Sequence, residues 1–421
     1  MKNAFLKSFV LRLSTSAYSV TVLLMRSLAI TPPQQTSWYR HARVALLGAL
    51  LLFAASERPA SWQDVLRAVW SPYLPFLLLL GVTALFQDKA TDAFWLLSIP
   101  ASFVLARLLR MWVPIQHLVL GVALLGLVLG TVFALGRSTF GDAVPPLEDL
   151  STYLHKNVYG WIVALGMVTA PFLWTRYGNR VSRRVLLGIL FALTAVVLFL
   201  TGSMTGFLGA GGTLIVASIV GAVASLRAGL NFSKVWPLLI PAAIGLLMAL
   251  VFFAVNLGTR SETTIASLAD RDVSLTGRTG LWACYLQGVS TAGADKAAVN
   301  QECVVGGGHS NLHNSFLEAH LIGGIVLAVG LLLAFALAIM QGVRAVLRSD
   351  NAISRSEALF ALAVAVLGFL IAMVESYIFS RHLYPSLVLF FAPLLIAGEL
   401  RRTGDSFRRL IRGLPLSTRR A

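Results

Sequence analysis

The chain has 421 residues, of which 57% are hydrophobic and 12% are charged, and its mean hydropathy is +0.79. Soluble domains carry about 25% charged residues, so this chain has too little polar surface to cover a globule in water, and lipid must solvate most of it. The net charge of +16 does not indicate nucleic-acid binding, because a membrane protein collects basic residues in its cytoplasmic loops.

Long apolar runs follow one another along the chain, and they are continuous rather than alternating. About 20 apolar residues in a helix cross a bilayer, whereas strands of a membrane barrel alternate apolar with polar residues. The runs predict an all-α polytopic membrane protein with about 12 transmembrane helices. The expected spans are residues 15–30, 43–56, 65–86, 91–107, 115–135, 155–175, 184–200, 203–226, 234–256, 313–343, 355–378 and 381–400.

These spans predict a division into helices 1–9 (residues 1–256), a large periplasmic loop (257–312), helices 10–12 (313–400) and a basic cytoplasmic tail (401–421). Most clusters of arginine and lysine fall on one side of the alternating spans, which makes that side and both termini cytoplasmic by the positive-inside rule. Arg40 and Arg43 are the exception. No small-residue cleavage site follows the first apolar run, so no cleavable signal peptide is expected.

The long loop contains both cysteines of the chain, Cys284 and Cys303. Two cysteines in one loop of an oxidising compartment are typical of a disulfide. Free thiols are the alternative, and a catalytic thiol would need an adjacent base and would leave the second cysteine unexplained. Trp282, Tyr285 and the apolar residues around them predict that the loop folds and packs on the bundle.

The densest polar cluster, from Gly306 to Glu318, directly precedes the tenth span. Ser310 and Asn311 are expected to cap the following helix, whose N-terminus favours an anion. His313 is then expected in the first helical turn. Histidine suits proton abstraction because its ordinary pKa lies near working pH; the alternative is a histidine that only caps or packs.

Two patterns could indicate a metal ion. His309 and His313 have the i, i+4 spacing of helical ligands, but the glycines before His309 disfavour a helix there. Asp270 and Asp272 form an Asp-x-Asp pair, but Arg271 lies between them. No metal is expected.

Arginines are few on the predicted outer side, and their guanidinium forks match phosphate oxygens. Arg278 and Arg137 have no close acidic neighbour in Leu275–Gly280 and Gly136–Thr139, which favours ligand contact. Arg260 has an acidic neighbour, so pairing within the protein is an equal alternative for it. His155 and Lys156 add cationic candidates near the same face.

Some polar residues are interpreted as structural. Arg381, His382 and Glu375 are expected to anchor the chain at the membrane interface. The small residues of Gly202–Gly206 are typical of close helix packing.

The segments Leu275–Trp282 and Gly306–Glu318, followed by Gly323 and Gly324, resemble the O-antigen ligase family, which shares this pattern with some O-antigen polymerases and protein O-oligosaccharyltransferases. The segment His155–Gly160 resembles the other outer-loop signature of the family. The chain departs from the pattern at Met204, where many members have arginine after the serine.

The resemblance implies an all-helical, C-type glycosyltransferase fold in the bacterial inner membrane, with the active site on the periplasmic face. It implies transfer of O-antigen polysaccharide from undecaprenyl pyrophosphate to lipid A–core oligosaccharide, with inversion and without a metal or other cofactor. The partners would be that lipid-linked donor, the lipid A–core acceptor and membrane lipids.

In this hypothesis Arg278 and Arg137 hold the pyrophosphate, where other enzymes use a metal. His313 removes the proton from the acceptor hydroxyl, and an asparagine orients the histidine or the sugar. The further substrate-binding candidates are His155, Lys156, Arg260, His309, Asn311 and Asn314.

Three alternatives stay open. A polymerase or a ligase acting on protein hydroxyls would use the same donor. A transporter or flippase would place polar residues at mid-membrane and carry internal repeats, and no clear repeat is present. A structural scaffold would not need arginines without acidic neighbours on the outer side.

Overall fold

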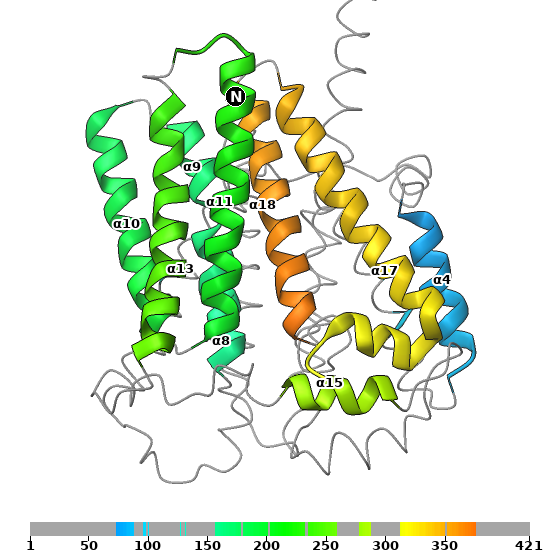
Figure 1. The fold of residues 1–421 in the computed structure, drawn as a ribbon. Helices are drawn as coiled ribbons and strands as arrows, with labels where there is room; N and C mark the ends of the chain where they lie inside the picture. The colour runs from blue at the N-terminus through cyan, green and yellow to red at the C-terminus, as the bar shows by residue number, and fades with distance from the viewer. Residues whose placement is uncertain are drawn as a thin grey trace, which may run out of the picture.

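The computed structural model describes residues 73–87, 96–97, 100, 127, 131, 156–177, 180–200, 203–231, 235–258, 278–287, 312–349 and 352–375. Every regular element within these residues is a helix (Figure 1), as predicted. The first two expected spans, the last one and the basic tail lie outside the described residues, so the count of twelve helices stays a prediction.

Four of the described helices are long and apolar enough to cross a membrane: α10 (Val181–Leu200), α11 (Met204–Arg227), α17 (Ser315–Leu347) and α18 (Ala352–Val374). The helices α4 (Leu74–Leu85) and α13 (Ile240–Gly258, preceded by the 3-10 turn η3, Trp236–Leu239) are also apolar. The chain is therefore a membrane-embedded protein.

One predicted span, 155–175, consists of two helices, α8 (Lys156–Met167) and α9 (Ala170–Tyr177). Pro171 explains the interruption, because its ring has no N–H to donate and clashes with the carbonyl one turn earlier. In the connecting turn the Thr169 hydroxyl donates to the Gly166 carbonyl at 2.7 Å.

The tenth predicted span is also interrupted. Gly323 and Gly324 have non-helical backbone angles inside α17, and Gly324 has a φ of 66°, which glycine adopts without steric cost. Figure 1 shows that the short first part of α17 lies across the end of the bundle, beside α15 (Arg278–Gln287).

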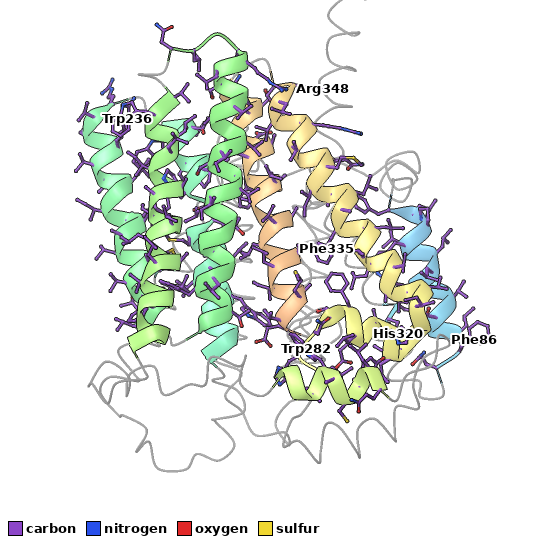
Figure 2. All side chains as sticks on the ribbon, viewed as in Figure 1. Phe86, Trp236, Trp282, His320, Phe335 and Arg348 are labelled. Atoms are coloured by element: carbon purple, nitrogen blue, oxygen red, sulfur yellow. The ribbon has the colours of Figure 1, made fainter. Side chains whose placement is uncertain are left out.

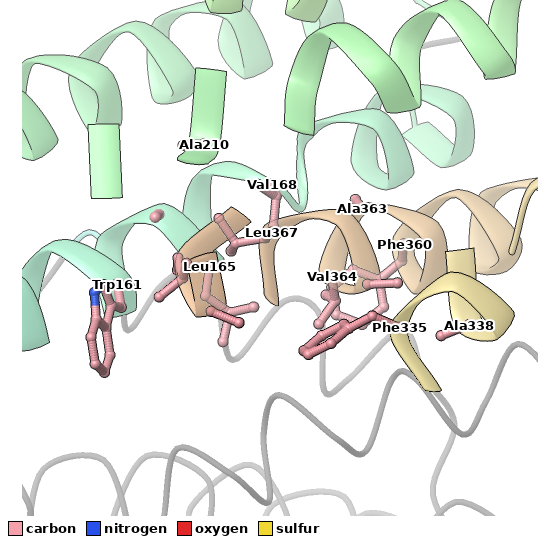
Figure 3. Packing of buried hydrophobic residues seen from close by; sticks show 14 of the residues in the cluster. Trp161, Leu165, Val168, Ala210, Phe335, Ala338, Phe360, Ala363, Val364 and Leu367 are labelled. Carbon is pink, nitrogen blue, oxygen red and sulfur yellow. The ribbon is translucent and has the colours of Figure 1, made fainter. Parts of the chain in front are cut away.

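Helix α18 is the centre of the bundle. In the most apolar 18-residue stretch of α18, 72% of the stretch is buried inside the protein. The corresponding share for α10, at the periphery, is 17%. Phe335 of α17 and Phe369 of α18 both pack edge-on against Phe316, and Phe172 of α9 packs against Phe360 of α18 in the same way. Figure 3 shows part of this core, with Phe335 of α17 labelled near Phe360 and Val364 of α18.

Glycines bring α8 and α11 into direct backbone contact. A Cβ at Gly206 would lie 2.7 Å from the Gly160 carbonyl oxygen, and a Cβ at Gly160 would overlap the side chain of Ser203. The prediction of close packing in Gly202–Gly206 is confirmed for these residues. Thr205 lies at this crossing, at the beginning of α11.

Most basic residues of the described part lie at one end of the bundle, here named the basic end: Arg176, Arg180, Arg183, Arg184, Arg227, Arg344, Arg348 and Arg355. Figure 2 shows Arg348 at this end, and Trp282 and His320 at the opposite one, here named the α15 end. The α15 end also contains the beginnings of α8, α11 and α17 and the end of α18 (Figure 1).

Arg355 belongs to the basic end but lies within the bundle rather than in a loop. It lies on α18 with 5% of its surface exposed, and its guanidinium donates to the Ser225 hydroxyl at 3.3 Å and the Ser349 carbonyl at 3.1 Å. It therefore connects α18 to α11 within the bundle instead of facing water.

Candidate functional site

A histidine and a carboxylate meet at the α15 end. The Nδ1 atom of His313 lies 3.3 Å from Oε2 of Glu375, and their side chains are 17% and 7% exposed. The hydroxyl of Thr205 donates to the other carboxylate oxygen at 3.4 Å. Both distances are at the long end of the range for hydrogen bonds.

His313 does not lie in a helical turn, which corrects the expectation from sequence. Helix α17 begins at Ser315, and His313 precedes it with a φ of 49°. Histidine is among the few residue types enriched in this left-handed region. Such a conformation costs on the order of 1–3 kcal/mol and persists only where the surroundings hold it.

The cap of α17 is Asn314, not Ser310 or Asn311. Its side-chain oxygen accepts from the backbone N–H of Phe316 at 2.9 Å and of Leu317 at 3.1 Å. A capping side chain reaches only the N–H groups two or three residues ahead, so a helix beginning at Ser315 requires its cap at position 314. Asn314 was expected to orient the histidine or the sugar, and here its oxygen caps the helix.

The same turn is bound to the end of α18. The Asn314 side-chain amide donates to the Met373 carbonyl at 2.8 Å, and the Ser315 hydroxyl donates to the Glu375 carbonyl at 2.7 Å. The last carbonyls of a helix have no partner within it, and these side chains satisfy two of them. The backbones of His313 and Glu375 are thereby held at a fixed separation.

The Glu375 side chain lies beside the beginnings of two helices, since it contacts Thr205 of α11 and His313 just before α17. The helix dipole is positive at both of these N-termini. Where a carboxylate accepts from Nδ1–H of a neutral histidine, the lone pair of the ring is on Nε2. That arrangement suits a general base that acts through Nε2.

Glu375 was interpreted from sequence as an interface anchor, and this was wrong. It is 5% exposed and faces His313 across 62 residues of sequence. One sequence signal pointed to it: an acidic residue at the edge of an apolar span is costly unless it is paired. Thr205 was overlooked because its segment was interpreted only as packing.

Helix α15 packs on the first part of α17. Leu281 and Tyr285 form a buried cluster with Leu312 and Leu321, so the apolar part of the long loop does pack on the bundle. The Tyr285 hydroxyl lies 2.8 Å from Nδ1 of His320. Burial, and secondly the charge of Glu318, raise the pKa of Tyr285 to about 12, so this hydroxyl keeps its proton.

Cys284 of α15 is disulfide-bonded. The sequence contains one other cysteine, Cys303, so within one chain the partner can only be that residue.

The remaining candidates are placed only in part. Arg278 is the first residue of α15 and Lys156 is the first residue of α8, so the backbone of both lies at the α15 end. The other candidates lie outside the described residues: Arg137, His155, Arg260, His309 and Asn311. In the part of the chain that the structure describes, no three His, Cys, Asp or Glu residues gather as metal ligands.

The fold and the site define a membrane-embedded helical protein with a histidine–carboxylate pair at one end of its bundle. The chain matches no protein-family model and has no significant match among curated proteins. The function is therefore proposed from the chemistry of the site and from the resemblance of its motifs.

Proposed function

We propose that the chain is an inverting membrane glycosyltransferase that moves O-antigen polysaccharide from undecaprenyl pyrophosphate to lipid A–core oligosaccharide. The observation that carries the proposal is the pair of His313 and Glu375, 3.3 Å apart at the α15 end. A base oriented by a carboxylate is what activation of a sugar hydroxyl requires. The gathering of arginines at the basic end supports placing the α15 end at the periplasmic face.

The proposed reaction is a single displacement. Nε2 of His313 takes the proton of the acceptor hydroxyl while that oxygen bonds to the anomeric carbon of the donor. The bond from this carbon to the pyrophosphate oxygen breaks, and undecaprenyl pyrophosphate leaves with the electron pair. Attack opposite to the leaving group inverts the anomeric centre. Glu375 stabilises the imidazolium that forms.

Cationic groups must neutralise the charge that develops on the leaving pyrophosphate. Arg278 and Arg137 are proposed for this, with Arg260 and Lys156 as weaker contacts. The placement of Arg278 and Lys156 at the beginnings of α15 and α8 supports their part in it, because helix N-termini add backbone donors for an anion. No step of the reaction needs a metal ion.

Polymerisation of repeat units, or transfer to protein hydroxyls, would use the same donor and base with another acceptor. Transport is the alternative of a different class. The histidine–carboxylate pair lies at one end of the bundle rather than at mid-membrane, where transporters place their binding sites, and this favours an enzyme over a transporter.

The decisive experiment supplies purified protein in detergent with lipid-linked O-antigen, lipid A–core and a chelator, and resolves the products on a gel. A ladder of lipopolysaccharide bands is expected. Longer lipid-linked chains in its place would make the protein a polymerase, and bands that require added divalent metal would move Asp270 and Asp272 into the mechanism.

Two variants test the assigned roles in this assay. We expect His313→Ala and Arg278→Ala each to lower the transfer rate by about 100-fold or more. Arg348→Ala, at the basic end, is the matched control and should transfer at the rate of the unmodified protein. A near-normal rate in either test variant would remove that residue from the mechanism.

A further inference from the structure

The residue before the candidate base is held by side chains at both of its backbone polar groups. Leu312 is fully buried. Its N–H donates to Oε1 of Glu318 at 3.0 Å, and its carbonyl accepts from the indole N–H of Trp282 at 2.8 Å. These bonds come from two elements, since Glu318 lies in the first turn of α17 and Trp282 on α15.

The indole bond acts on the backbone of His313 directly. The Leu312 carbonyl belongs to the planar peptide group that joins Leu312 to His313. The φ angle of His313 is the rotation about its N–Cα bond relative to this plane. By holding the plane, Trp282 therefore restricts φ of His313. That φ is 49°, a value that needs restraint from outside the residue.

The other side of His313 is fixed as well. Asn314 caps α17 and donates to the Met373 carbonyl, and Ser315 donates to the Glu375 carbonyl. With the following residues bound to α18 and the preceding peptide bound to α15, neither φ nor ψ of His313 is free to relax. The imidazole can then face Glu375 without rearrangement.

We propose that Trp282 and Glu318 are positioning residues that aim His313 by holding the two backbone polar groups of Leu312. The inference rests on the proposed role of His313 as the base. It adds that α15, which begins at Arg278, is joined to the base through Trp282 and the Leu312 carbonyl. The backbones of Arg278 and His313 then keep a fixed position relative to each other during the reaction.

Trp282→Phe tests the proposal, because it removes the indole N–H and keeps an aromatic ring in the cluster with Leu281 and Leu312. Trp236→Phe is the matched control: Trp236 is 50% exposed and lies at the basic end (Figure 2). We expect Trp282→Phe to lower kcat about tenfold or more, because a misplaced base loses effective concentration. KM should stay within about twofold, and the control should match the unmodified protein.

Glu318 provides two further variants, and their results do not depend on whether Trp282→Phe folds. Glu318→Gln keeps an oxygen that can accept from Leu312 N–H, whereas Glu318→Ala does not. We expect Gln to retain kcat within about twofold and Ala to lower it. Equal losses in both variants would mean that the charge, not the bond to the backbone, matters, and would overturn the assignment.

A spectroscopic readout separates this inference from the proposed reaction. In protein labelled at the histidine ring nitrogens, the His313 signal is identified among the seven histidines by its loss in His313→Gln. We expect Trp282→Phe to shift this signal as the contact with Glu375 changes, and Trp236→Phe to leave it in place.

Each combination of results is decisive. A shifted signal with lowered kcat supports the positioning role. If Trp282→Phe shifts the signal but the unmodified protein transfers no glycan, the positioning role is supported and the proposed reaction is refuted. An unshifted signal, an unchanged kcat in active protein, or a change confined to KM overturns the positioning role.

Discussion

At the scale of single residues, the chemistry of His313 depends on the group that faces its Nδ1. The Glu375 carboxylate is buried, accepts from Thr205 and lies at two helix N-termini. In the proposed mechanism, a carboxylate in such a position orients the histidine and stabilises the imidazolium that forms when the proton is taken. Without that carboxylate, the same imidazole would be less firmly oriented.

Replacing Glu375 by glutamine tests this dependence. The amide keeps the size of the side chain and one accepting oxygen but removes the charge, so an imidazolium at His313 would lose its counterion. We expect kcat for glycan transfer to fall about 10- to 100-fold, with little change in the thermal unfolding midpoint.

Glu357→Gln is the control, because Glu357 lies near the opposite end of the same helix α18. A Glu375→Gln protein that retains the kcat of the unmodified protein would show that the carboxylate serves packing alone.

At the scale of secondary-structure elements, the site depends on how closely α8 and α11 approach each other. Gly160 and Gly206 let the two backbones touch, and this crossing places Thr205 beside Glu375 at 3.4 Å. Membrane helices associate through small residues because lipid offers no hydrophobic driving force between them. The crossing of α8 and α11 therefore contributes to the stability of the bundle and also sets the position of Thr205 beside the Glu375 carboxylate.

Gly206→Ala should disturb this crossing. The added Cβ would lie 2.7 Å from the Gly160 carbonyl oxygen, and relieving such overlap costs about 1–3 kcal/mol. We expect a lower unfolding midpoint in detergent and slower glycan transfer, since Thr205 is the neighbouring residue.

Gly188→Ala is the matched substitution, because nothing lies within 4 Å of a Cβ at Gly188 in α10. It should be neutral or slightly stabilising, since alanine favours helix by about 1 kcal/mol over glycine. Equal midpoints for the two variants would contradict the close approach of α8 and α11.

At the scale of the whole molecule, the bundle has two chemically different ends. The basic end carries arginines at the ends of α9, α11 and α17 and at the beginning of α10. The α15 end carries the histidine–carboxylate pair and the disulfide-bonded Cys284. Arginine on the cytoplasmic side and a disulfide on the oxidising side are consistent with a single orientation in the membrane.

Cysteine labelling tests that orientation. Phe86 is 79% exposed and lies at the α15 end (Figure 2), and Ser182 lies between arginines at the basic end. In spheroplasts a membrane-impermeant maleimide should react with Phe86→Cys and not with Ser182→Cys, and both should react after permeabilisation. Cys284 should not interfere, because it is disulfide-bonded. The reverse labelling pattern would place the site in the cytoplasm and exclude the proposed acceptor.

Much of the fold could be predicted from the pattern of apolar residues along the chain. Apolar runs of sufficient length predicted the membrane helices α10, α11, α17 and α18 because helix formation in lipid depends on composition over a single stretch of chain. The breaks at Pro171 and Gly323–Gly324 were missed, because an apolar run does not show whether its helix is continuous. His313 was singled out by its position between a glycine-rich segment and an apolar span.

The sequence by itself determined that the chain is an all-helical membrane protein and that its polar residues concentrate before α17. Only the tertiary structure decided the partner of His313, because Glu375 lies 62 residues away in sequence and Thr205 contacts that carboxylate from 170 residues away. Such pairs form where separate helices end at the same level of the bundle, and that level depends on how the helices pack. For the same reason, only the packing of α15 on α17 revealed the contact between Trp282 and the peptide that precedes His313.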